Sequence, residues 1–95
     1  MKLVYLPSTI ADLEWMRTYN TRVFPSGLQK AQVQFRATEK LLLDHPHIGK
    51  VTDYPDTYEL VITRTPFSII YRLSDDQIQI LRIWDNRADR TNLMR

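Results

Sequence analysis

The residues best suited to chemistry are arginines that gather toward the end of the chain. Every basic residue after Lys50 is an arginine, and the last of these are Arg82, Arg87, Arg90 and Arg95. The guanidinium group is planar and permanently charged, so it binds phosphate or carboxylate groups through paired hydrogen bonds. These arginines predict contact with an acidic partner, and the alternative is that they form a solvated basic tail.

A second group of polar residues surrounds two histidines in the stretch H-P-H-I-G at residues 45–49, with Asp44 and Asp53 nearby. A metal site needs several ligands in a fixed geometry, and this spacing does not provide one. Because the chain has Cys 0, a thiolate metal site is also excluded. We therefore predict no metal and no cofactor, and we interpret the stretch as a helix end followed by a glycine turn.

Length and composition indicate a single domain over residues 1–95. The 95 residues include 43% hydrophobic and 25% charged residues, which is typical of a globular chain with one core. The net charge of +2 permits an acidic partner without requiring one. The apolar stretch before Pro7 is too short for a signal peptide, and no stretch is long enough to span a membrane. We expect a cytoplasmic protein.

Two helices that form a hairpin are expected in the first half of the chain, after a short apolar strand at residues 2–6. The first helix opens at Pro7, and its apolar residues recur at intervals of three: Ile10, Leu13 and Met16. The second opens with the S-x-x-Q spacing of a capping box at residues 26–29 and ends before Pro46. One of its faces carries Leu28, Ala31, Phe35 and Leu42.

After residue 57, strand-forming residues alternate with turns, which predicts an antiparallel meander with strands at residues 58–63, 67–73 and 78–84. With residues 75–76 in the last turn, the register pairs Leu73 with Ile78, Tyr71 with Ile80, Ile69 with Arg82 and Phe67 with Trp84. The predicted fold class is therefore α+β, with an N-terminal helical hairpin packed on one face of a small twisted antiparallel sheet. Residues 2–6 join this sheet as an added strand.

This register leaves the opposite face of the sheet half apolar, with Ser68, Ile70, Arg72, Gln79, Leu81 and Ile83 upon it. The two helices can cover only one face, so a partner is expected on the other. The alternative is that the chain ends or residues 51–57 shield it. Arg82 falls among apolar residues, which predicts either an acidic partner such as Glu39 or Asp44, or a register that is off by one.

The order of these segments resembles the RelE/ParE superfamily of toxins from type II toxin-antitoxin modules, with a pattern closer to the ParE-like members. The resemblance runs from end to end and is carried by L-x-x-x-P-x-I-G at residues 42–49, then E-L-V-I, P-F-S-I-I-Y-R-L, D-D-Q-I-Q-I-L-R-I-W and D-N-R-A-D-R. It implies the α+β fold described above and a cognate antitoxin whose C-terminal segment wraps and inhibits the toxin. The half-apolar face would receive that segment at Ile70, Arg72, Leu81 and Ile83. A homodimer is also compatible with the sequence.

Two activities occur in this superfamily: RelE-like members cut messenger RNA on the ribosome, and ParE-like members poison DNA gyrase. RNA cutters place proton-transfer groups on the open sheet face and at the end of the last strand. This chain has Ser68 where many of them have arginine, and Asp85 where the last strand often ends in histidine. The remaining candidates for RNA cleavage are Arg72, Arg87 and Arg90, with Tyr58 and Asp85 as distant ones.

Arginine binds phosphate but transfers protons poorly, since its pKa lies above about 12. We therefore favour a toxin that uses Arg72, Arg87 and Arg90 to bind an essential target, with DNA gyrase as the favoured one. The first alternative is a ribosome-dependent mRNA endonuclease. The second is an inactive family member that binds only its antitoxin.

Overall fold

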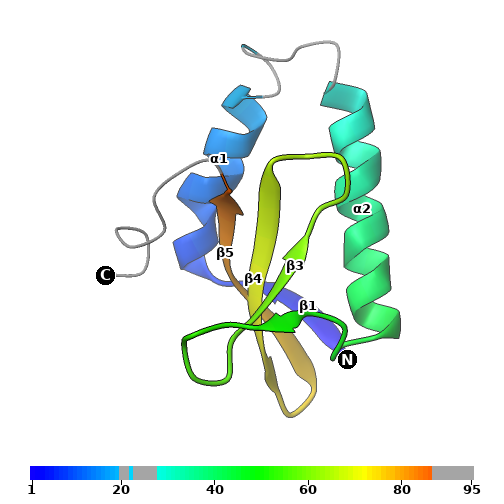
Figure 1. Ribbon diagram of the computed structural model, residues 1–95, viewed down its shortest axis with the longest axis vertical. Helices are drawn as coiled ribbons and strands as arrows, with labels where there is room; N and C mark the ends of the chain where they lie inside the picture. The colour runs from blue at the N-terminus through cyan, green and yellow to red at the C-terminus, as the bar shows by residue number, and fades with distance from the viewer. Residues whose placement is uncertain (20–21, 23–27, 87–95) are drawn as a thin grey trace.

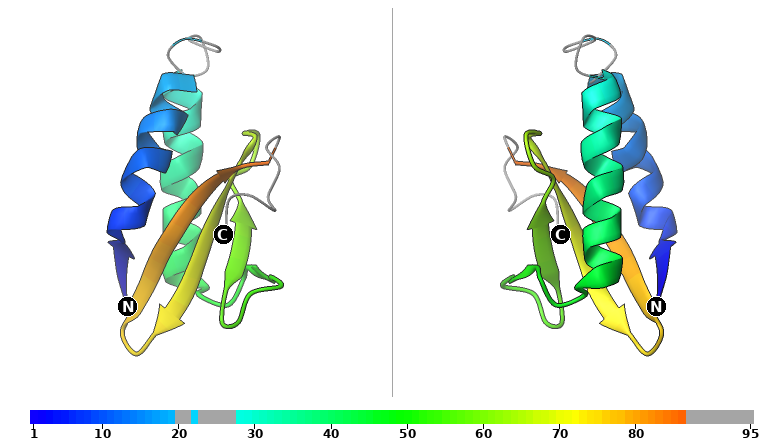
Figure 2. Two further views of the ribbon diagram at one scale, coloured as in Figure 1. Left: turned by 90° about the vertical axis from the view of Figure 1, so that its left-hand side faces the viewer. Right: turned by 90° about the vertical axis from the view of Figure 1, so that its right-hand side faces the viewer.

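A computed structural model describes residues 1–19, 22 and 28–86 of the chain. Two helices pack on one side of a five-stranded sheet with the strand order β1-β5-β4-β3-β2, which confirms the α+β fold class (Figures 1 and 2). In chain order the elements are β1 (Lys2–Tyr5), the 3-10 turn η1 (Pro7–Thr9), α1 (Ile10–Thr18), α2 (Leu28–Asp44), β2 (Lys50–Val51), β3 (Tyr58–Val61), β4 (Phe67–Ser74) and β5 (Gln77–Asp85). Position 26 of the expected capping box lies outside the described residues.

The first strand differs from the others in direction. β3, β4 and β5 pair antiparallel, as the meander predicts, and the short β2 adds a further antiparallel strand outside β3. β1 lies parallel to β5 at the other edge, so the sheet is mixed. The ladder continues past β1, because the Leu6 amide donates to the Ile80 carbonyl over 3.1 Å. The entry into α1 is therefore attached directly to β5.

The core lies between the helices and the sheet. Its buried members are Leu42, Ile62, Phe67, Ile69, Tyr71, Ile78, Ile80 and Ile83. From the helices, Leu13, Met16 and Phe35 pack against this cluster, as their spacing predicts. Ile10 is an exception to the predicted apolar face, since it is 59% exposed.

The second helix is fastened to the first strand by Tyr5. The ring of Tyr5 stacks on that of Phe35 with a centroid distance of 6.2 Å, and its hydroxyl donates to the Glu39 carboxylate. Burial, together with this bond, raises the pKa of Tyr5. Because β1 in turn pairs with β5, these contacts join α2 to the edge of the sheet that β1 and β5 form.

The predicted register between the last two strands is correct near the turn and wrong beyond it. Leu73 pairs with Ile78 and Tyr71 with Ile80, but a bulge then shifts the pairing by one residue. Past the bulge the pairs are Ile70 with Arg82, Ile69 with Ile83, Ser68 with Trp84 and Phe67 with Asp85. The extra residue is Leu81, which has no partner in the ladder. Each β5 side chain after Leu81 therefore points to the face opposite to the one that the predicted register gave it.

The bulge lies where α1 meets β5, and a single carboxylate joins them. Asp12 of α1 accepts two hydrogen bonds from Arg82, of 2.6 Å from Nε and 2.9 Å from the terminal nitrogen, and one of 3.0 Å from the Ile83 amide. The pKa of Arg82 is raised mainly by its hydrogen bond to Asp12. Arg82 thus has an acidic partner, but neither Glu39 nor Asp44 is that partner.

Replacing Asp12 with alanine should lower the free energy of unfolding by about 2–4 kcal/mol, because it leaves a partly buried guanidinium and a strand amide without their acceptor. Urea unfolding measures the change. Glu14→Ala, at an exposed carboxylate on the same helix, serves as the matched control and should change stability by less than about 0.5 kcal/mol. Equal stability of the two variants would contradict this role of Asp12.

Candidate functional site

The face of the sheet turned away from the helices, here called the open face, follows from the observed register. Phe67, Ile69 and Tyr71 enter the core, so the intervening Ser68, Ile70 and Arg72 point to the open face. Their neighbours across the strands are Val61, Glu59, Trp84, Arg82 and Gln79. One hollow lies on this face, and a second lies where β4 ends and is lined by residues of both faces.

The expected apolar contacts on this face need correction. Ile83 belongs to the core on the helix side, because the bulge at Leu81 turns it inward. Trp84 was expected in the core opposite Phe67, but it is buried on the open face beside Ser68. Ile70 does lie on the open face and is fully buried, while Leu81 is half-buried.

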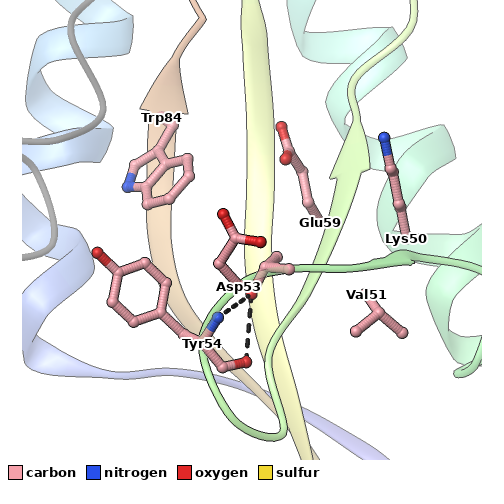
Figure 3. Close-up of a pocket in the computed structure, with 7 residues that line it drawn as sticks. Lys50, Val51, Asp53, Tyr54, Glu59 and Trp84 are labelled. Atoms are coloured by element: carbon pink, nitrogen blue, oxygen red, sulfur yellow. Dashed lines mark hydrogen bonds between the residues drawn. The ribbon is translucent and has the colours of Figure 1, made fainter.

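The first hollow, here called the aromatic recess, has a volume of about 290 Å³. It is lined by Lys50, Val51, Thr52, Asp53, Tyr54, Glu59 and Trp84. The rings of Trp84 and Tyr54 lie at one end, Lys50 and Val51 at the other, and the carboxylates of Asp53 and Glu59 between them (Figure 3). Residues 51–57 therefore shield part of the open face, which was one of the alternatives that the sequence left open.

Hydrogen bonds within residues 52–57 give the wall of this recess a defined shape. The Thr52 hydroxyl accepts from the Tyr54 amide over 3.1 Å, and the Thr52 amide donates to the Thr57 carbonyl over 3.0 Å. Asp56 adopts the left-handed conformation with φ 57°, which aspartate tolerates better than most residues. The recess is therefore present before any ligand binds.

The second hollow, here called the arginine hollow, has a volume of about 370 Å³ and lies beyond the start of β3. Its lining residues are His47, Asp56, Tyr58, Arg72, Leu73, Ser74 and Gln79. Arg72 is exposed, and its Nε donates to the Gln79 side-chain oxygen over 2.6 Å. Gln79 is held in turn by Gln77 over 3.0 Å. This arrangement orients the guanidinium of Arg72 at the lining of the hollow.

Tyr71 places His47 in this hollow. Its hydroxyl accepts from the Gly49 amide over 2.8 Å and donates to the Pro46 carbonyl over 2.9 Å, so it fixes the turn on both sides of His47. Burial raises the pKa of Tyr71. A side chain at Gly49 would overlap the Tyr71 ring and hydroxyl, which explains the glycine. The ring of Tyr58 stacks on Tyr71 at 5.5 Å.

Ser68, near the start of β4, and Asp85, at the end of β5, both have structural partners. The Ser68 hydroxyl is buried and accepts from the Asn86 side-chain amide over 2.8 Å, while the Asn86 backbone amide donates to Pro66 over 2.7 Å. The Asp85 carboxylate accepts from the indole of Trp15 over 3.4 Å. Ser68 and Asp85 are thus engaged in holding the strand end.

Of the predicted arginine set, the structure describes only Arg72; Arg87 and Arg90 lie outside the described residues. His47 is the main residue that sequence reasoning missed, because we interpreted it as part of a glycine turn. The presence of a histidine in this turn was the available signal. The aromatic recess carried no such signal, since the facing of Trp84 depends on the bulge.

Other site classes find no support in the described ranges 1–19, 22 and 28–86. There, no three histidine, cysteine, aspartate or glutamate side chains group as metal ligands would. Over the same residues, no helix is both long and apolar enough to cross a membrane.

Comparison with known proteins decides the family. The sequence model described as "ParE toxin of type II toxin-antitoxin system, parDE" matches residues 3–90. The chain belongs to the ParE toxin family. A solved structure titled "Chromosomal ParDE TA system from P. aeruginosa" resembles this ParE-like toxin with a TM-score of 0.71 and 29% sequence identity, over 87% of this chain and 92% of that one. No curated protein sequence matches the chain.

Membership in this family makes the chain the toxin component of a type II toxin-antitoxin system. Such a system pairs the ParE toxin with a cognate antitoxin.

Tyr71→Phe should lower the free energy of unfolding by about 1–3 kcal/mol at neutral pH, because the Gly49 amide and the Pro46 carbonyl lose their partner. The hydroxyl's contribution is complete below the ordinary tyrosine pKa of 10.0. This contribution to stability is lost as the pH rises through the higher pKa of Tyr71 in the folded chain, since Tyr71 ionises at lower pH in the unfolded chain. The stability gap between wild type and variant should therefore narrow above about pH 10.

Urea unfolding at neutral pH and at about pH 10.5 measures both effects. Tyr54→Phe, at an exposed tyrosine, is the control and should leave stability unchanged at neutral pH. Two results would contradict the role assigned to this hydroxyl: equal stability of wild type and Tyr71→Phe at neutral pH, or a difference in stability that grows at alkaline pH.

Proposed function

We propose that this ParE toxin stops growth by binding DNA gyrase in the cytoplasm, and that its cognate antitoxin neutralises it by covering the open face. Membership in the ParE family supports a toxin. We favour a toxin that binds its target over one that cuts RNA because of the hydrogen bonds that Ser68 and Asp85 form. Where RNA cutters place arginine and histidine, these side chains hold Asn86 and Trp15.

Target binding is assigned to Arg72, Arg87 and Arg90. Arg72 is exposed at the edge of the arginine hollow, and its bond to Gln79 limits the rotamer freedom that binding would otherwise remove. A guanidinium suits carboxylates on an acidic protein surface because it keeps its charge and offers paired donors. Arg87 and Arg90 enter this proposal from the sequence alone.

Antitoxin binding is assigned to the open face and its outer edge. β2 pairs only with Tyr58 and Glu59, and β4 pairs with the inner edge of β3, so among the described strands none covers the outer edge of β3 at Leu60 and Val61. An extended antitoxin segment could add a strand there and continue across Arg72 and Leu81. Ile70 and Ile83 are no longer included, because both are buried in the folded chain.

Purified toxin should block DNA supercoiling by gyrase in a gel assay of plasmid topology. Arg72→Ala should raise the concentration needed for half inhibition roughly tenfold, as expected for the loss of one charged contact of about 1.4 kcal/mol. Arg36→Ala, at an exposed arginine on α2, is the matched control and should inhibit like wild type. Unchanged supercoiling at a clear molar excess of toxin over gyrase would reject the target.

The arginine hollow favours one alternative, cleavage of messenger RNA on the ribosome. It brings together a histidine, a tyrosine and an arginine that the sequence did not connect: His47, Tyr58 and Arg72. In cleavage by the 2′-hydroxyl, His47 would take the proton of that hydroxyl and Arg72 would stabilise the charged phosphate. Tyr58 would give a proton to the leaving 5′-oxygen, which completes the proton balance.

A translating extract distinguishes this alternative from gyrase binding. If the hollow cuts RNA, added toxin shortens ribosome-bound messages, and His47→Ala reduces the cleavage rate by roughly 100-fold or more. His45→Ala, two residues away and also exposed, should cut like wild type. Because we favour gyrase, we expect intact messages with all three proteins; cleavage that depends on His47 would overturn that choice.

A further inference from the structure

The turn between β3 and β4 holds an arginine in a backbone conformation that arginine disfavours. Arg64 has a φ of 64°, in the left-handed region where the Cβ atom of a side chain crowds the following carbonyl. The Thr65 amide donates to the Ile62 carbonyl over 3.1 Å, which makes Arg64 the third residue of a four-residue turn. Glycine and asparagine suit that position best when its φ is positive. An arginine there lowers stability relative to an asparagine.

Hydrogen bonds of Thr65 fix this turn independently of the arginine side chain. The Thr65 hydroxyl donates to the Ile62 carbonyl over 2.8 Å and accepts from the Phe67 amide over 3.1 Å. The Ile62 amide donates in turn to the Phe67 carbonyl over 2.9 Å. Arg64 itself is exposed, and within the described residues its side chain forms no hydrogen bond or ion pair. Contacts among the described residues therefore do not account for an arginine at this position.

The place of the turn in the fold connects Arg64 with the proposed arginine set. The Asn86 amide donates to the Pro66 carbonyl over 2.7 Å, so the turn and the end of β5 lie at the same end of the sheet (Figure 1). In the sequence, Arg87 and Arg90 follow Asn86. Arg64 thus places a permanent positive charge at the end of the sheet where the described chain leads into two arginines assigned to target binding.

Resting on the proposed binding of gyrase, we infer that Arg64 is a further target-binding residue, which presents its guanidinium to a carboxylate on the protein surface of the target. The fixed turn holds the backbone of Arg64 before binding, which lowers the entropic cost of the contact. The guanidinium keeps its charge and offers a carboxylate paired donors. A phosphate backbone fits less well, because the same end of the sheet carries Asp85 and the net charge of the chain is only +2.

Arg64→Asn separates this role from a structural one. Because asparagine tolerates a positive φ, the variant should unfold thermally at or above the midpoint temperature of the wild type. It should nevertheless need roughly tenfold more protein for half inhibition of supercoiling by gyrase, through the loss of one charged contact. In cells, at equal protein levels, its expression should also slow growth less than that of the wild type. Lys40→Gln, which removes an exposed positive charge from α2, is the matched control and should act like the wild type.

A lower midpoint temperature for Arg64→Asn, or inhibition and toxicity equal to those of the wild type, would overturn the inference. Binding of the wild type to free DNA that Arg64→Asn abolishes would also overturn it, since the residue would then contact phosphate groups. If the wild type is toxic without inhibiting gyrase, the proposed target fails, and the toxicity of Arg64→Asn decides the inference: reduced toxicity supports it and equal toxicity rejects it. A wild type without toxicity would overturn both.

Discussion

The carboxylate of Asp12 is the contact on which the arrangement of the open face depends. It joins α1 to β5 immediately after the bulge at Leu81, through two bonds to Arg82 and one to the Ile83 amide. Without an acceptor there, the strand amide and the guanidinium would both be partly buried at a cost of several kcal/mol. These bonds of Asp12 thereby stabilise a bulge that turns Ile83 into the core and Trp84 toward the open face. The aromatic recess exists because of this reversal.

Tyr71 performs a comparable role at the other end of the sheet. From within the core, its hydroxyl holds the turn between α2 and β2 through Gly49 and Pro46. That turn places His47 at the arginine hollow, and the Tyr71 ring stacks on Tyr58, which also lines the hollow. A buried side chain therefore determines which polar groups meet around Arg72. Packing and surface chemistry are connected through this one hydroxyl.

Local patterns in the sequence were sufficient for most of the fold. Helical spacing placed Leu13, Met16 and Leu42 in the core, and turn residues located the strands and the register as far as Tyr71. The bulge could not be predicted, because it depends on a contact between Asp12 and a strand about 70 positions later. The same limit applies to the site: Arg72 was found from its charge, whereas His47 and Trp84 gained their positions from tertiary contacts. For the same reason Ile83 was assigned to the wrong face.

The central claim is that this toxin binds its target through the open face, and hydroxyl-radical footprinting with gyrase tests it most directly. The chain offers a matched pair of valines: Val61 on the open face is 53% exposed, and Val33 on α2 is 61% exposed. We expect gyrase to reduce the oxidation of Val61 and of the nearby exposed Tyr54, while Val33 reacts as in the free chain. Protection of Val33 with no change at Val61 and Tyr54 would contradict the account.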